Sequence, residues 1–405
     1  MNYDMQQKSS SQTSPKPETV LVMQAGGSLG AYECGVCKIL SKHDIEFDII
    51  AGTSIGAINA TIIAAGYSKK EGIRNSVKRC EDFWMDLAEN IALPSFLPYK
   101  QRSELAAVHS LFYGNTRAFT PLWVMPGGMP FYYFFNSPYL YDISRLKNTI
   151  GKYVDFTELE RVRSEQKYKD RKDNGNNSVT SSSSGDNGAP RLILTATNVQ
   201  TGESVIFDSN DIDIKADHVI ASAGYALYGL PWTKVNESYL WDGSFVYNTP
   251  LRAVTKASPK YEKIAYVTDV FPRKQEKLPA NMPETYHRVR DLLFTDRSIQ
   301  QTKEISDSIK KHLSLIEQMH ELIMSNNNPN INIKDAKVKS RLDKIEEEYN
   351  NLVHNERGLI MDRIIQIQRI ERAGRHFIFE DADFSIDTIT ELIKQGEEDA
   401  EDALK

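Results

Sequence analysis

The stretch Gly52-Thr53-Ser54-Ile55-Gly56 decides the fold of this chain. It has the G-x-S-x-G pattern of a nucleophile elbow, in which a serine occupies a sharp turn between a strand and a helix. A β-carbon two residues to either side of the serine would collide within the turn, and glycine at both flanks removes that collision. The segments before and after the motif agree with such a turn, because residues 47–51 are expected to form a short buried strand and residues 55–65 a helix. Ser54 is therefore a candidate nucleophile.

A second glycine-rich turn, residues 24–30, lies between an expected buried strand at 19–23 and an expected helix at 31–41. Such a turn directs backbone N–H groups at the positive end of a helix dipole and so makes an anion site. A nucleotide phosphate, a reaction oxyanion and a plain tight turn are the three interpretations. The turn lacks the Gly-Lys-Ser/Thr ending of a Walker loop, and Ala25 replaces the first glycine of a dinucleotide fingerprint. Both turns end successive strands, so we expect them side by side at one sheet edge.

Composition narrows the class of protein. The chain has 405 residues, a formal net charge of −6 and three cysteines. The charge gives no indication of nucleic-acid binding, and the cysteine count favours a reducing, cytoplasmic compartment over a disulfide framework. Cys34 and Cys37 form a C-x-x-C with no second pair, which favours packing in a helix over a metal site. The uncharged run 49–68 divides into strand, turn and helix, so we do not interpret it as a membrane span, and residues 1–17 show no signal peptide.

The chain divides into three parts. Residues 1–17 are polar and are expected to be a disordered tail, residues 18–275 form a catalytic domain, and residues 276–405 form a mostly helical C-terminal region. A serine-rich loop at about 164–190 is expected to be disordered. The C-terminal region carries two amphipathic patterns at 299–323 and 342–353, an expected strand near 361–370 and a last helix capped by Ser385.

Residues 91–136 are rich in proline, glycine and aromatic side chains. So much apolar surface in a stretch broken by prolines suits a loop over a cleft or a surface that meets lipid. Simple packing on the core is an equally good interpretation. Farther along, residues 191–197 and 203–207 are expected to pair as a hairpin, and residues 263–268 to form another strand.

A serine needs a neighbouring base to become a nucleophile. The usual order of an α/β hydrolase places a histidine after the acid, and His287, His312, His320, His354 and His376 follow Asp242. None of these histidines has a clear catalytic-loop context. Asp242 ends an expected strand before a glycine, and a carboxylate beside the serine can itself act as the base. From the residues alone, however, a turn-forming Asp-Gly is the favoured interpretation.

Together these motifs resemble the patatin-like phospholipases, in particular bacterial members with an added C-terminal region. Residues 24–32 are similar to the family's oxyanion loop, and residues 52–60 to its nucleophile elbow. Residues 218–223 and 241–251 resemble its Asp-Gly region. Ala25, Leu29 and Ser244 depart from the most common residues of the family, without removing a catalytic group.

The resemblance implies a three-layer α/β/α fold with a mainly parallel sheet, and hydrolysis of lipid acyl esters without a metal or another cofactor. It implies that Ser54 is the nucleophile, that Asp242 is the base and that Gly26, Gly27 and Ser28 supply oxyanion N–H groups. It implies a lipid ester as substrate and leaves peripheral membrane contact and the oligomeric state open. The rival function is a patatin-fold protein that binds lipid or a partner with weak or no hydrolase activity.

Overall fold

The computed structural model describes residues 16–67, 72–124, 135–157, 159, 189–257, 261–271, 273–275, 278–295, 364–372 and 379–405. Most of the expected disordered tail and of the expected disordered loop lies outside these residues. Both helices expected between 299 and 353 also lie outside them.

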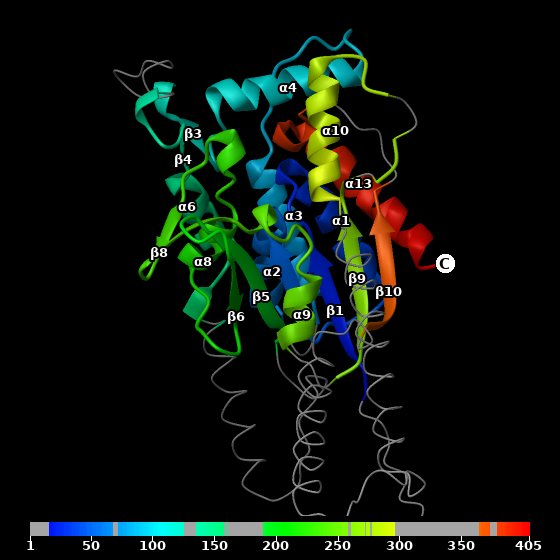
Figure 1. Ribbon diagram of the computed structural model, residues 1–405. Helices are drawn as coiled ribbons and strands as arrows, with labels where there is room; N and C mark the ends of the chain where they lie inside the picture. The colour runs from blue at the N-terminus through cyan, green and yellow to red at the C-terminus, as the bar shows by residue number, and fades with distance from the viewer. Residues whose placement is uncertain are drawn as a thin grey trace, which may run out of the picture.

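A mainly parallel sheet forms the middle of the described structure (Figure 1). Its strands are β1 (Glu18–Met23), β2 (Ile49–Thr53), β5 (Arg191–Asn198), β6 (Ser204–Asp208), β7 (Thr233–Val235), β8 (Ser238–Asp242), β9 (Lys263–Asp269) and β10 (Ile364–Glu371). They are ordered β10-β9-β1-β2-β5-β8-β7, with β6 paired to β5. The run from β10 to β5 is parallel, whereas β6 and β8 are antiparallel to β5. A separate pair joins β3 (Thr120–Pro121) to β4 (Tyr141–Asp142).

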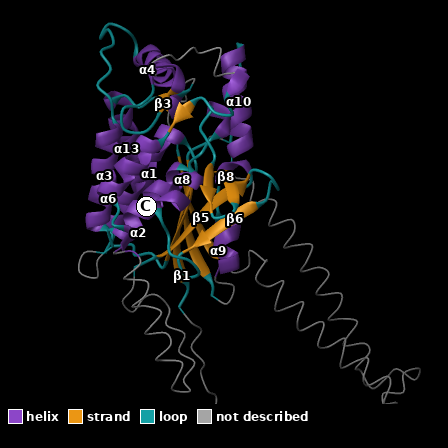
Figure 2. Cartoon of the chain, turned by 90° about the vertical axis from the view of Figure 1, so that its left-hand side faces the viewer, coloured by secondary structure: helices purple, strands orange, loops and turns teal. Residues whose placement is uncertain are grey.

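Helices cover both faces of the sheet (Figure 2). They are α1 (Gly30–Lys42), α2 (Ile55–Ala65), α3 (Arg74–Leu87), α4 (Tyr99–Tyr113), α6 (Ser144–Tyr153), α8 (Ala216–Ser222), α9 (Leu251–Ala257), α10 (Met282–Phe294) and α13 (Ile386–Ala403). Helices α1, α2 and α3 pack in one large apolar core with one face of the sheet, and α9 packs in a smaller core on the other. The predicted three-layer α/β/α fold is thus confirmed.

Strand β1 forms as expected and β2 forms two residues later than the expected 47–51, and both are strands because their apolar, β-branched residues are buried on both faces. The hairpin of β5 and β6 and the strand β9 were also predicted correctly. The stretch 91–136 differs from expectation, because residues 99–113 form the helix α4. Residues 125–134, which include four of the eleven aromatic residues of that stretch, lie outside the described residues.

The C-terminal region is built into the same body as the sheet. Strand β10 pairs in parallel with β9, and α13 packs along α1. The two helices approach closely at Gly35 and Gly396. A β-carbon at Gly396 would lie 2.0 Å from the carbonyl oxygen of Tyr32, and one at Gly35 would lie 2.0 Å from the carbonyl oxygen of Ile393. Only glycine allows this contact between the backbones.

We expect Gly396→Ala to lower the free energy of unfolding by about 1–3 kcal/mol, because the added methyl group separates α13 from α1. Urea unfolding monitored by circular dichroism measures this change. Gly151→Ala is the matched control, because nothing lies within 4 Å of a β-carbon at Gly151 in α6. The control should gain about 0.5–1 kcal/mol from helix propensity. Equal effects of the two substitutions would contradict the packing argument.

Candidate active site

The turn between β2 and α2 holds Ser54 in a backbone conformation that residues with a side chain rarely adopt. Its φ is +57° and its ψ is −123°. A β-carbon at Gly52 would lie 2.2 Å from the carbonyl oxygen of Gly56. One at Gly56 would lie 2.5 Å from the carbonyl oxygen of Gln24. Both separations are too short for any β-carbon, so the turn requires glycine on each side of the serine.

The backbone of Ser54 is anchored by a residue that sequence reasoning missed. The N–H of Ser54 donates to the hydroxyl oxygen of Ser222, the last residue of α8, at 2.9 Å. This bond ties the elbow to a segment 168 residues farther along the chain. The resemblance included Ser222 within a matching stretch, but nothing in the local sequence indicated its contact.

The register of β5 brings Asp242 to Ser54. Thr195 of β5 pairs with Thr53, the residue before the serine, and the next residue, Ala196, pairs with Asp242. Both of these residues of β5 pair with β6 on the opposite side. Strands β2 and β8 therefore meet end to end along the same side of β5, and their last residues are adjacent. This geometry places the candidate base beside the candidate nucleophile.

The carboxyl group of Asp242 is completely buried. Its Oδ1 accepts a hydrogen bond from the N–H of Ser244 at 2.8 Å. Burial raises the pKa of Asp242 to about 6, against the opposing effect of the Ser54 and Ser244 donors. Among the described residues, Oδ2 accepts no hydrogen bond of standard geometry, although the Ser54 hydroxyl lies near enough to lower the pKa. Hydrogen bonds between a base and its nucleophile are often long or poorly aligned before substrate binds.

The glycine-rich turn forms a short 3₁₀ helix, η1 (Gly27–Leu29), beside the elbow. Gly27 has a φ of +56°, which favours glycine. Within the described part of the chain, no hydrogen bond uses the N–H of Gly26, Gly27 or Ser28 as its donor. These three groups are available to an anion. Gly26 and Gly27 line the same cavity as Ser54, and Ser28 is buried beside them.

The cavity that contains Ser54 and Asp242 has a volume of about 130 Å³. Its walls are mainly apolar and include Ile55, Leu111, Tyr141, Phe271, Phe294 and Phe384. An apolar cavity with a few convergent polar groups is typical of a site for a largely apolar ligand.

None of the described histidines lines this cavity. His287, the predicted alternative base, is buried in α10, where its Nδ1 lies 3.9 Å from Asp291. His312, His320, His354 and His376 lie outside the described residues. Among the residues that the structure describes, the carboxylate of Asp242 is therefore the best-placed base for Ser54.

The sequence model of the patatin-like phospholipases matches residues 21–255, more than half of the chain. The chain belongs to the patatin-like phospholipase family. The matched span contains the glycine-rich turn, the elbow and Asp242, which meet in the cavity.

The individual proteins that resemble this chain match only a short part of it or share little sequence identity with it. Over 62 residues the chain is 36% identical to the uncharacterized protein L620 of Acanthamoeba polyphaga mimivirus, a match covering 14% of this chain and 17% of that protein. The chain thus aligns with about a sixth of the length of this relative. VipD from Legionella pneumophila has a TM-score of 0.35 at 13% identity, covering 96% of this chain and 67% of VipD. The type III effector ExoU, from Pseudomonas aeruginosa, has a TM-score of 0.28 at 13% identity, covering 82% and 70%.

A segment outside the family match, which ends at residue 255, packs against the glycine-rich turn of this patatin-like site. The 3₁₀ helix η7 (Glu380–Ala382) packs so closely that a β-carbon at Gly27 would lie 2.2 Å from the carbonyl oxygen of Asp381. The hydroxyl of Ser28 donates to the carbonyl oxygen of Glu380 at 2.7 Å. Both contacts act on the turn that carries the candidate oxyanion donors.

Buried charges fix η7 in place. Arg290 of α10 forms an ion pair with Asp381 and another with Asp291 at 2.8 Å. Arg372 forms an ion pair with Glu380 at 2.7 Å. Arg290 and Asp381 also line the Ser54 cavity, where they neutralise each other. Arg290 therefore adds no net positive charge to the cavity, which also contains the carboxyl group of Asp242.

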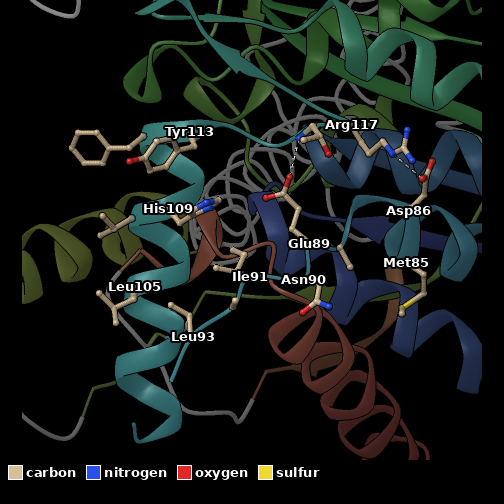
Figure 3. Close-up of a pocket in the computed structure, with 15 residues that line it drawn as sticks. Met85, Asp86, Glu89, Asn90, Ile91, Leu93, Leu105, His109, Tyr113 and Arg117 are labelled. Atoms are coloured by element: carbon tan, nitrogen blue, oxygen red, sulfur yellow. Dashed lines mark hydrogen bonds and ion pairs between the residues drawn. The ribbon is translucent and has the colours of Figure 1, made fainter. Parts of the chain in front are cut away.

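A larger groove, about 1040 Å³ in volume, lies between α4 and the segment after α3 (Figure 3). None of the residues that line the Ser54 cavity lines this groove. Its charged groups already have partners, since Asp86 pairs with Arg117 at 3.1 Å and Glu89 accepts the N–H of Thr116 at 2.9 Å. The smaller cavity, not the larger groove, is therefore the candidate active site.

We expect Arg290→Met to lower the free energy of unfolding by about 3–5 kcal/mol, because it leaves buried carboxylates without their cation. Arg74→Met is the control, since Arg74 pairs with Asp44 on the exposed surface and should change stability by less than about 1 kcal/mol. Chemical denaturation of both variants measures the difference. A change at Arg290 no larger than that at Arg74 would show that the buried cluster does not hold η7.

Proposed function

We propose that the chain is a serine acyl hydrolase that cleaves lipid acyl esters through a dyad of Ser54 and Asp242. The observation that carries the proposal is their meeting in one apolar cavity, at the ends of β2 and β8. Membership of the patatin-like phospholipase family supports a lipid ester as the substrate.

The chemistry follows from these positions. Asp242 accepts the proton of the Ser54 hydroxyl while Oγ attacks the ester carbonyl carbon, and the N–H groups of Gly26, Gly27 and Ser28 stabilise the oxyanion. The tetrahedral intermediate collapses, the alcohol leaves with the proton held by Asp242, and the acyl group remains on Oγ. Asp242 then takes a proton from water as the hydroxide attacks the acyl-enzyme, and the second tetrahedral intermediate collapses to the fatty acid while Asp242 returns that proton to Ser54 Oγ.

A second candidate function is lipid or partner binding with weak or no hydrolysis. The mainly apolar cavity favours it, because such walls bind a lipid chain whether or not Ser54 reacts. A fluorophosphonate separates the two functions, because it labels only an activated serine. Labelling of Ser54 supports the hydrolase, whereas an intact wild-type chain that resists labelling supports the binding function.

We expect Ser54→Ala to lower the turnover of a lipid ester by about 10⁴-fold or more. Asp242→Asn should lower kcat by several orders of magnitude, since an amide does not accept the serine proton. Rates are measured on a panel of lipid esters with variants of verified fold. His287→Ala is the control and should stay within about tenfold of the wild type. A loss at His287 as complete as that at Asp242 would replace the dyad by a triad.

We expect kcat/KM to rise with pH through an apparent pKa of about 6, because the buried Asp242 must be ionised to act as the base. At pH 5 the rate should fall about tenfold below its plateau. The folded pKa exceeds the unfolded value of about 3.9, so the contribution of Asp242 to stability is fully present below pH 3.9 and is lost as the pH rises through 6. The rate loss at pH 5 should therefore occur without unfolding caused by this group. A flat profile between pH 5 and 8 would exclude Asp242 as the base.

A further inference from the structure

Helix α10 has the reverse of the usual distribution of side chains. Its buried residues are the polar His287, Arg290 and Asp291 together with one apolar residue, Phe294. Three large apolar side chains on the outside, Met282, Val289 and Leu293, are 75%, 49% and 65% exposed. A surface helix normally buries its apolar stripe and exposes its charges. The outer face of α10 is therefore suited to an apolar environment rather than to water.

Helix α4 shows the same reversal. Its buried residues are small, namely Ser103, Ala106, Ala107 and Ser110. Its outer residues Leu105, Val108 and Phe112 are 46%, 42% and 61% exposed. These three side chains follow one another at helical spacing and form one wall of the open groove in Figure 3. Large apolar residues on the outside of two helices are more than the scattered exposure of an ordinary surface.

Both helices lie at the end of the molecule toward which the parallel strands point, in both views (Figures 1 and 2). This is the end at which β2 delivers Ser54 to the cavity. The inner side of each helix also contributes to that cavity, through Leu111 of α4 and Phe294 of α10. The exposed apolar faces are thus continuous, through the same two helices, with the walls around the candidate nucleophile.

We propose that the outer faces of α4 and α10, represented by Leu105, Val108, Phe112, Met282, Val289 and Leu293, dock on a lipid bilayer. We call these six residues the apical surface. This proposal rests on the proposed function, since a bilayer docked on the apical surface presents its acyl esters to the Ser54 cavity.

The mode of docking is apolar rather than electrostatic. The chain carries a formal net charge of −6, which gives no general attraction to anionic lipid. The exposed side chains supply aliphatic and aromatic area, the kind that partitions into the acyl boundary of a bilayer. None of the described helices is long and apolar enough to span a membrane. The docking is accordingly peripheral, and it should persist at about 1 M NaCl, where exposed charges are screened.

The test measures co-sedimentation with phosphatidylcholine vesicles in a Ser54→Ala background, so that binding does not depend on turnover. Adding Val108→Asp and Val289→Asp should lower the partition coefficient by at least about tenfold, because charges oppose transfer of the apical surface from water. Ile206→Asp is the matched control, since Ile206 is an exposed apolar residue of β6, outside the apical surface. It should stay within about twofold. Circular dichroism verifies that each variant is folded.

The proposal is overturned if the Ser54→Ala chain does not bind the vesicles, if the Asp variants bind equally well, or if binding disappears at high salt. It is also overturned if light scattering shows that the wild type self-associates through residues 108 and 289. A water-soluble short-chain ester separates this outcome from failure of the proposed function. If both proposals are right, the double variant Val108→Asp/Val289→Asp made in the chain that keeps Ser54 loses hydrolysis of vesicle lipid but retains hydrolysis of the soluble ester. Vesicle binding by a wild type that hydrolyses neither substrate would retain the docking surface and reject the hydrolase.

Discussion

The positive φ of Ser54 is the constraint on which the rest of the site depends. It requires glycine at 52 and 56, and it brings the start of α2 so close to β1 that a β-carbon at Gly56 would meet the backbone of Met23 and Gln24. The nucleophile elbow at residues 52–56 and the first residues of the glycine-rich turn consequently pack against each other as one unit. Movement of either would displace Ser54 relative to the candidate oxyanion donors, and the proposed catalysis depends on that geometry.

Beneath this unit lies a buried polar network centred on Glu33 of α1. Its carboxyl group accepts hydrogen bonds from the N–H of Gln24 at 2.7 Å and from the hydroxyl of Thr268 at 2.6 Å, and it also accepts from Asn59. Burial raises the pKa of Glu33 to about 8, although these three donors oppose the shift. The network joins α1, α2 and β9 under the two turns. The buried carboxyl group of Glu33 therefore holds the elements beneath the two turns in place, whereas the carboxyl group of Asp242 faces Ser54.

The sequence was most informative where structure is local. The apolar runs of β1 and β2 and the G-x-S-x-G turn follow from short-range periodicity and sterics, so they could be predicted. Helix α4 could not, because its buried face is made of Ser103, Ala106 and Ser110 and gives no apolar stripe toward the core. The hydrogen bond from Ser54 to Ser222 and the contact between Gly27 and Asp381 also left no local signal. Both depend on pairing between segments far apart in the chain.

The role of the C-terminal region follows from where those distant segments meet. The family match ends at residue 255, yet Phe271, Phe294 and Phe384 line the Ser54 cavity. The ion pair of Arg290 with Asp381 connects two C-terminal segments where Asp381 packs against Gly27 of the glycine-rich turn. The matched domain thus contains the candidate nucleophile and base, whereas much of the apolar wall comes from residues beyond it. If the proposed function is right, differences in acyl preference among family members should arise in the C-terminal region, where the wall can change without disturbing Ser54 or its turn.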